Sequence, residues 1–365
     1  MQLRRHNKMN GPISFQTRLT GNQAFYNHSD YITSTKEDFN FPHTLSTTYR
    51  WNAEHKIIRI IKDALSLIVF PFTIMHIIAG KIALLPASSP TLLERSENFA
   101  HKARMAIDLQ SSWKYKRLTI KVDDYKIDAM IMGQKETLHN GRWVLVSNGN
   151  AEFYESKLNE GQFKKLLVQI NGNAIFFNYP GVGASSKMPN KNAMTKAYQA
   201  LLHFLEDQEK GVAAKEIIGY GHSIGAGVQA EALKRHALKS GIKYVWVKSR
   251  TFSDLATTAS LITNKVLGLL VKVIGWNIDC VESSKTLQAP EIILQTASVT
   301  SYQELTNSSK IIDDGIIPEN ATLAKVLLDQ GCSISKKRII GVPESHNEEL
   351  TELQYLANSI NQMLA

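Results

Sequence analysis

The sequence has few cysteines and lacks low-complexity tracts, internal repeats and clustered metal ligands. Its two cysteines among 365 residues, Cys280 and Cys332, lie far apart. Two cysteines so far apart in the sequence indicate free thiols in a reducing compartment, with a single disulfide between them as the alternative. Neither a His/Cys/Asp cluster with ligand spacing nor a phosphate-binding glycine loop occurs. We therefore expect no metal ion and no organic cofactor.

The basic N-terminal residues also lack the apolar core of a secretory signal peptide. The net charge of +9 belongs entirely to residues 1–121, which carry 17 Lys+Arg against 8 Asp+Glu, whereas residues 122–365 carry 25 of each. This charge flanks an apolar stretch instead of alternating with exposed aromatic residues, so we expect no nucleic-acid partner. The predicted location is the cytoplasm.

Two N-terminal regions precede the main domain. Residues 1–55 are polar with little periodicity and predict poor order. Residues 56–114 predict an apolar and basic helical extension, in which residues 64–80 carry no formal charge. A span needs about 20 apolar residues. Three alternatives stay open for this segment: a kinked helix packed on the domain, an interfacial or re-entrant membrane helix, and a true span. Flanking lysines and arginines make residues 56–86 a candidate for contact with an anionic membrane surface.

Residues 115–365 show short strands alternating with helical segments. This alternation predicts an α/β domain with a mostly parallel, eight-stranded sheet and helices on both faces. A lid-like insert is expected at residues 250–290, between the sixth and seventh strands. In such sheets, functional sites collect at the carboxyl ends of the strands, where the polar loops fall here.

The segment EIIGYGHSIGAGVQAEAL places Ser223 between a predicted strand and a predicted helix. Gly221 and Gly225 flank the serine, as a sharp strand-to-helix turn requires. This is the G-x-S-x-G pattern of a nucleophile elbow, in which the hydroxyl stands clear of the sheet near a helix N-terminus. Ser223 is therefore the candidate nucleophile.

A serine nucleophile needs a histidine base and an acid that orients it, in the chain order Ser, Asp or Glu, His. Only His236 and His346 follow Ser223. His236 belongs to the region of the elbow's own helix and points away, whereas His346 directly follows the last predicted strand. His346 is the candidate base, with a capping or surface role as the alternative.

Three residues are candidates for the acid. Asp314, after the seventh predicted strand, is preferred, with its neighbour Asp313 and with Asp254 after the sixth strand as alternatives. A purely structural role for Asp313 and Asp314, in capping the helix expected near Pro318, also stays open.

An oxyanion hole needs two backbone N–H groups directed at the developing negative charge. Ile224, next to the nucleophile, is one candidate donor. Asn150, in the loop Asn148-Gly149-Asn150 that follows the strand RWVLVS, is the other.

These motifs resemble those of α/β-hydrolases over residues 115–365. SNGNAE is similar to the oxyanion loop, NYPGVGASS to the loop after the fourth strand, and GHSIG to the elbow. Together with the apolar segment ending LLPASS, the chain most resembles the CHLPS-type hydrolase-like proteins of Chlamydia and the SidB-type secreted effectors of Legionella. The resemblance implies a Ser-His-Asp triad and a bacterial effector delivered into a host cell. It implies no settled substrate.

Apolar residues in the insert bear on the substrate. Leu267, Leu269, Leu270 and Ile274 predict either a lid over an acyl chain or a helix packed on the sheet. With the N-terminal segment, they favour a serine hydrolase of ester or thioester bonds in lipid-like acyl substrates. The alternatives are a catalytically silent scaffold that binds a membrane or host protein, and an acyltransferase on the same fold. The sequence does not indicate an oligomeric state.

Overall fold

The computed structural model describes residues 44–46, 79, 112–150, 152–158, 161–331 and 336–365. Most of the predicted N-terminal regions, 1–55 and 56–114, therefore lies outside the described residues, and so does the membrane contact expected at residues 56–86. Within that segment only Ala79 is described, and it packs against the hydrophobic core. Among the described residues, no helix combines the length and apolar character needed to cross a membrane.

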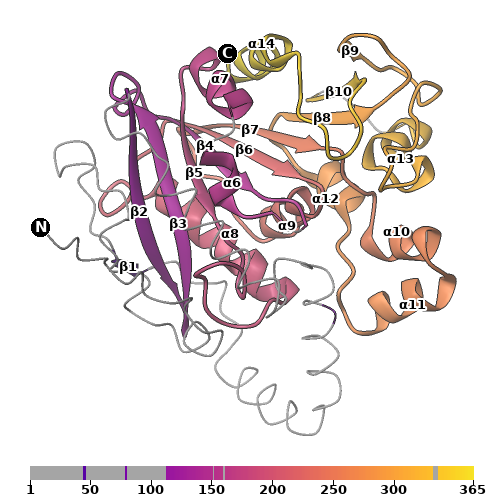
Figure 1. The fold of residues 1–365 in the computed structure, drawn as a ribbon, viewed down its shortest axis with the longest axis horizontal. Helices are drawn as coiled ribbons and strands as arrows, with labels where there is room; N and C mark the ends of the chain where they lie inside the picture. The colour runs from indigo at the N-terminus through magenta and orange to yellow at the C-terminus, as the bar shows by residue number, and fades with distance from the viewer. Residues whose placement is uncertain (1–43, 47–78, 80–111, 151, 159–160, 332–335) are drawn as a thin grey trace, which may run out of the picture.

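A single sheet organises the described part of the chain (Figure 1). Its order is β1-β2-β3-β5-β4-β6-β7-β8-β10-β9. The strands are β1 (Thr44–Ser46), β2 (Trp113–Val122), β3 (Tyr125–Gln134), β4 (Arg142–Ser147), β5 (Asn173–Phe177), β6 (Glu216–His222), β7 (Lys243–Ser249), β8 (Glu291–Thr296), β9 (Gln303–Glu304) and β10 (Lys337–Val342).

The sheet confirms the predicted α/β-hydrolase fold. Strand β3 runs antiparallel to β2 and β5, and β4 to β8 and β10 pair in parallel through the centre. Strand β5 lies between β3 and β4, so the chain crosses over once before adding β6, β7, β8 and β10 in turn. The eight predicted strands are all present. The short strands β1 and β9 extend the two edges, which the sequence did not predict.

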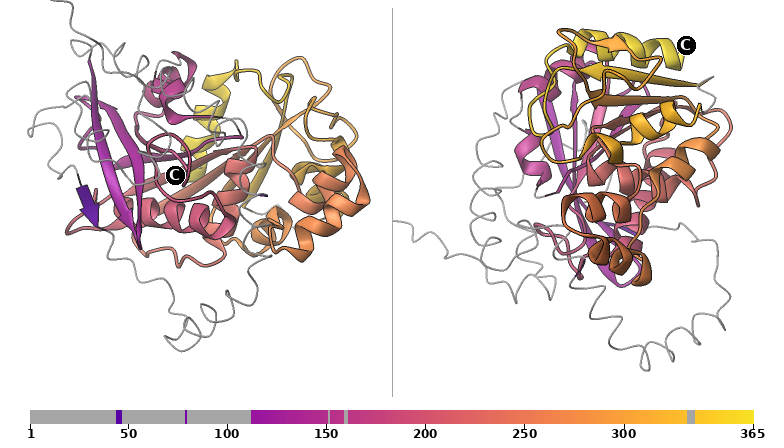
Figure 2. Two further views of the ribbon diagram at one scale, coloured as in Figure 1. Left: turned by 60° about the horizontal axis from the view of Figure 1, so that its bottom comes forward. Right: turned by 90° about the vertical axis from the view of Figure 1, so that its right-hand side faces the viewer.

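Helices cover both faces of the sheet (Figures 1 and 2). One face is packed by α8 (Lys191–Glu206), α9 (Ile224–Leu233), α12 (Cys280–Thr286) and α13 (Leu323–Asp329). The other is packed by α6 (Tyr154–Leu158), α7 (Gly161–Gln169) and α14 (Leu353–Leu364). The longer helices α8 and α14 bury an apolar face on strands whose side chains alternate between the two faces, and α9 is buried on all sides. The central strands β4, β6 and β7 are consequently buried over most of their length, as in a parallel sheet covered on both sides.

The hairpin of β2 and β3 shows how local sequence sets the register. Val122 pairs with Tyr125, which leaves Asp123 and Asp124 as a two-residue turn. Asp123 adopts a φ of 50°, a left-handed conformation that aspartate tolerates better than most residues. Asp123 and Asp124 therefore form the tight turn that closes this hairpin.

The predicted insert follows β7 and contains α10 (Leu255–Ile262), α11 (Lys265–Val273) and α12. Ile274 is buried in the core, whereas Leu267, Leu269 and Leu270 are exposed. Packing on the domain is therefore right for Ile274 and wrong for the three leucines. Cys280, at the start of α12, is a free thiol, and burial raises its pKa to about 12. Cys332 lies outside the described residues.

Candidate active site

Ser223 occupies the turn between β6 and α9. Its backbone has a φ of 51° and a ψ of −122°, a conformation that non-glycine residues rarely adopt. Two neighbouring groups hold it there: the Ser223 N–H donates to the carbonyl of Ser249 at 3.0 Å, and the Thr251 hydroxyl donates to the Ser223 carbonyl at 2.9 Å. The end of β7 thus fixes the strained backbone of Ser223.

The flanking glycines are required by close backbone approach. A Cβ on Gly225 would lie 2.3 Å from the carbonyl oxygen of Ser147, and a Cβ on Gly221 would lie 2.6 Å from Cα of Ala226. Real Cβ atoms essentially never come so close to backbone atoms. The glycine spacing therefore allows α9 to start directly against the end of β4.

His346 and Asp314 form a buried pair. Imidazole Nδ1 lies 2.8 Å from Asp314 Oδ2, and the His346 backbone N–H donates to the Asp314 carbonyl at 2.8 Å. The other carboxylate oxygen, Oδ1, accepts N–H groups of Ile316 and Ile317 at 2.9 and 2.6 Å. With one oxygen held by the backbone, the second is directed at the imidazole. This arrangement favours a proton on Nδ1 and leaves Nε2 as an acceptor.

The other acid candidates lie elsewhere. Asp313 is exposed, and its side chain accepts the N–H of Gly315. Asp254 caps α10 by accepting the N–H of Thr257 at 2.9 Å. Of the three predicted carboxylates, Asp314 is the one placed on the His346 ring.

The ring of His346 lies next to the elbow. Its centroid is 4.9 Å from that of His222, the residue before Ser223. Within the described residues, however, no hydrogen bond joins the Ser223 hydroxyl to His346. The structure therefore brings the candidate nucleophile and base to one edge of the sheet without linking them directly.

His222 is a buried histidine at this edge. Burial holds its pKa well below the usual value, and the positive charges of Arg250 and His346 act in the same direction. The neutral His222 ring therefore does not add a second positive charge beside an imidazolium at His346.

The predicted oxyanion loop packs on the elbow. The Asn148 side chain donates to the Phe177 carbonyl at 3.2 Å, and the Tyr179 hydroxyl donates to the Asn148 carbonyl at 2.8 Å. Asn150 is exposed at the end of this loop. Ile224 is the first residue of α9, and the first N–H groups of a helix have no partner within it.

Glu152 lies at this edge of the sheet, although no motif in the sequence pointed to it. Its carboxylate accepts the N–H of Gly149 at 2.6 Å and lies 3.5 Å from the ammonium group of Lys157. The sequence shows that a carboxylate follows the SNGNA loop, but it does not show which way the side chain of Glu152 turns.

Arg250 is the second residue that was missed. It is buried directly after β7, and its guanidinium donates to the carbonyls of Ser345 and Glu348, the latter at 2.7 Å. The Glu348 carboxylate accepts the N–H of Ser345 at 2.7 Å. These bonds hold both sides of the short segment that carries His346. A charged residue at a strand end was the only signal in the sequence.

A cavity of about 220 Å³ opens at this edge of the sheet. It is lined by polar and apolar side chains from α7, from the end of β6 and from the segment around His346, including Glu152, His222, Arg250 and His346. The candidate base is thus accessible from a recess that can hold part of a substrate.

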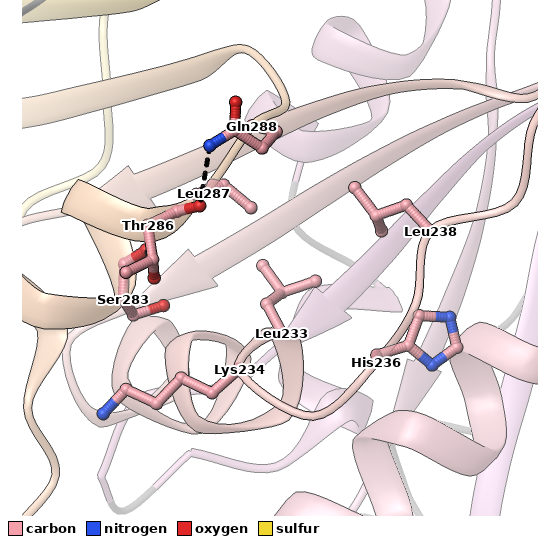
Figure 3. A pocket seen from close by; sticks show the side chains of 8 residues that line it. All are labelled: Leu233, Lys234, His236, Leu238, Ser283, Thr286, Leu287 and Gln288. Atoms are coloured by element: carbon pink, nitrogen blue, oxygen red, sulfur yellow. Dashed lines mark hydrogen bonds between the residues drawn. The ribbon is translucent and has the colours of Figure 1, made fainter.

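A separate cavity of about 340 Å³ lies at the far end of α9, beside Leu233 and Leu238 (Figure 3). His236 lines it, past the end of α9 rather than within the helix as the sequence predicted. Its Nε2 lies 2.9 Å from the buried carboxylate of Glu206. His236 therefore belongs to a buried hydrogen-bonded pair with Glu206, away from Ser223.

Comparison with known proteins places this geometry in context. Residues 34–365 match the family model described as Chlamydia CHLPS protein (DUF818). No curated protein matches the sequence. Similar solved structures include an esterase of Pyrococcus furiosus, with 13% identity, a TM-score of 0.49 and coverage of 70% of this chain and 93% of that chain. An α/β-hydrolase of Vibrio vulnificus has 14% identity, a TM-score of 0.47 and coverage of 68% and 79%. A cold-adapted esterase from an Arctic intertidal metagenomic library has 16% identity, a TM-score of 0.47 and coverage of 71% and 97%.

Proposed function

We propose that this chain, which belongs to the Chlamydia CHLPS protein family (DUF818), is a serine hydrolase of carboxylic ester or thioester bonds. The observation that carries the proposal is the buried bond of 2.8 Å between Asp314 and His346 at the sheet edge where Ser223 stands in a strained elbow. Strain of this kind persists where the surrounding structure enforces it, and it gathers at functional sites.

In the proposed reaction, Nε2 of His346 accepts the proton of the Ser223 hydroxyl while Oγ attacks the carbonyl carbon of the ester. Asp314 stabilises the resulting imidazolium. The N–H groups of Ile224 and Asn150 hold the oxyanion. His346 then gives the proton to the departing alcohol or thiol as the bond between the acyl carbon and that leaving group breaks. In the second half of the reaction His346 accepts a proton from water, the water oxygen attacks the acyl carbon, the bond to Oγ breaks, and the proton returns to Ser223 as the carboxylic acid leaves. The bond between Ser223 and His346 is expected to form with substrate bound, since such bonds are often long in empty sites.

The substrate class proposed is a lipid-like acyl ester. An apolar hairpin, α10 and α11, follows β7 at the same edge of the sheet as Ser223. Thr251, four residues before this hairpin starts, bonds directly to the backbone of Ser223. We infer that the acyl chain of an ester bound at Ser223 extends toward the apolar side chains of α10 and α11.

A series of p-nitrophenyl esters tests this proposal. We expect kcat/KM to rise from acetate toward octanoate, by up to about fourfold for each added methylene, because each buried methylene adds apolar transfer energy. The Ser223→Ala protein serves as the blank for hydrolysis outside the site. A higher kcat/KM for acetate than for the longer esters would rule out a lipid-like substrate. Hydrolysis by Ser223→Ala at the wild-type rate would rule out Ser223 as the nucleophile.

Arg250 provides a test of how His346 is held. We expect Arg250→Gln to lower kcat by about 10- to 100-fold, with KM within about twofold, because loosening the segment that carries the base misplaces it by a fraction of an ångström or more. Steady-state kinetics on p-nitrophenyl butyrate measures both constants. The matched control is Arg338→Gln on β10, where the guanidinium bonds to the exposed Gln362. Equal kcat values for the two variants would show that Arg250 does not position the base.

A further inference from the structure

The hairpin of α10 and α11, residues 255–273, exposes a continuous apolar surface. Seven of the ten large hydrophobic side chains that are exposed among the described residues belong to it. Val266 is 75% exposed and Leu269 is 63% exposed. Contiguous apolar patches of this kind mark interaction sites. In Figures 1 and 2 the hairpin lies at the periphery of the molecule, beyond α12 and α13.

The hairpin is a well-defined unit. Asp254 caps α10, and Asn264 caps α11 by accepting the N–H of Leu267 at 3.0 Å. A Cβ on Gly268 would lie 2.6 Å from the carbonyl of Ala256, so the two helices touch at their backbones. The apolar side chains are therefore held outward by a packed scaffold.

The charges of the hairpin indicate an anionic partner. Its charged side chains are Lys265 and Lys272, both exposed, and residues 255–278 contain no Asp or Glu. Lysines that flank an apolar face are the combination that binds the interface of an anionic bilayer, where apolar groups enter the acyl boundary and ammonium groups meet headgroups.

The same charges disfavour two other occupants. A second copy docked symmetrically on this face would place lysines near lysines with no carboxylate in the hairpin to pair them. The apolar segment at residues 64–80 of the chain is itself flanked by Lys56, Arg59, Lys62 and Lys81, so its docking here would also bring like charges together.

We propose that the α10–α11 hairpin docks on an anionic lipid bilayer. Its root is joined to the elbow through the bond from the Thr251 hydroxyl to the Ser223 carbonyl. Docking there holds the edge of the sheet that carries Ser223 close to the lipid. The proposal concerns the described hairpin, not residues 56–86, and its vesicle test does not depend on ester hydrolysis.

The test uses the full chain and unilamellar vesicles of phosphatidylcholine, alone or mixed with phosphatidylserine. We expect the wild type to sediment with the mixed vesicles, and Leu269→Asp to lower the partition coefficient at least about tenfold. Val266→Ser, a neutral change at the most exposed position, is expected to act in the same direction. Replacing Lys265 and Lys272 by glutamine is expected to cost about fivefold per lysine on mixed vesicles only.

Val168→Asp is the matched control, since Val168 is 52% exposed on α7, outside the hairpin. It is expected to bind as the wild type does. All variants keep residues 56–86, so hairpin variants that bind like the wild type would overturn the proposal. A wild-type protein that sediments with neither kind of vesicle would overturn the proposal as well. Light scattering that finds a dimer dissociated by Leu269→Asp, without vesicle binding, would assign the surface to a second copy instead.

Discussion

Replacing Asp314 by asparagine is expected to lower kcat for p-nitrophenyl butyrate by about 10⁴-fold, with little change in KM. The asparagine Oδ1 can still accept the N–H groups of Ile316 and Ile317, as the carboxylate does. Its amide group then meets Nδ1 of His346, so the imidazole adopts the other tautomer and Nε2 carries a proton. Such a ring cannot accept the proton of Ser223.

Two matched variants separate this effect from a general change in charge. Asp313→Asn removes the neighbouring carboxylate, which is exposed and accepts only the N–H of Gly315 in the structure. Asp254→Asn removes the charge of the residue that caps α10, while the amide oxygen can still accept the N–H of Thr257. Both are expected to keep kcat within about threefold of the wild type, since neither carboxylate meets the imidazole. If either loses more activity than Asp314→Asn does, the acid has been assigned to the wrong residue.

Substitution of Ser223 is expected to lower kcat more than any other change. One of the two substitutions, to glycine, is also expected to raise the free energy of unfolding. Ser223→Ala and Ser223→Gly should both lose about 10⁵- to 10⁶-fold in kcat, as expected for removal of a nucleophile. Glycine also adopts the φ of 51° without strain, whereas alanine does not. Relief of strain, less the entropy that glycine loses on folding, predicts a gain of about 1 kcal/mol in the free energy of unfolding for Ser223→Gly alone.

Urea unfolding followed by circular dichroism measures this difference, with Ser223→Ala as the reference. Ser223→Gly should unfold at the higher urea concentration. Equal midpoints would mean that the elbow backbone is not strained. Retained hydrolysis in both variants would mean that another residue attacks the ester.

Local pattern and chain order were sufficient to choose three candidates that the structure brings to one edge of the sheet. Ser223 follows from two glycines that permit backbone contact, which the clash of a Cβ at Gly225 with Ser147 explains. His346 was chosen by elimination, because the other histidine after the elbow, His236, was expected in the elbow's own helix and directed away. The structure places His236 past the end of that helix, against Glu206. The position of Asp314 after the seventh long strand was enough to prefer it, and the structure places it on the His346 ring.

Features that depend on side-chain direction could not be predicted. Arg250 and Glu152 lie in segments that were recognised, but a sequence does not show whether a charged side chain turns toward solvent or toward a loop carbonyl. The insert illustrates the same limit. Apolar periodicity identified Leu269 and Ile274 as one group, yet the end of α11 buries Ile274 and leaves Leu269 exposed. The edge strands β1 and β9 are too short to carry a pattern.

Reaction with a fluorophosphonate, followed by mass spectrometry of the labelled peptide, shows directly whether Ser223 is a nucleophile activated by His346. We expect a single adduct on Ser223 in the folded wild type and labelling at least about 10³-fold slower in His346→Ala, because the alcohol then lacks its base. No adduct in the folded wild type, an adduct on a different serine, or an unchanged rate in His346→Ala would contradict this expectation.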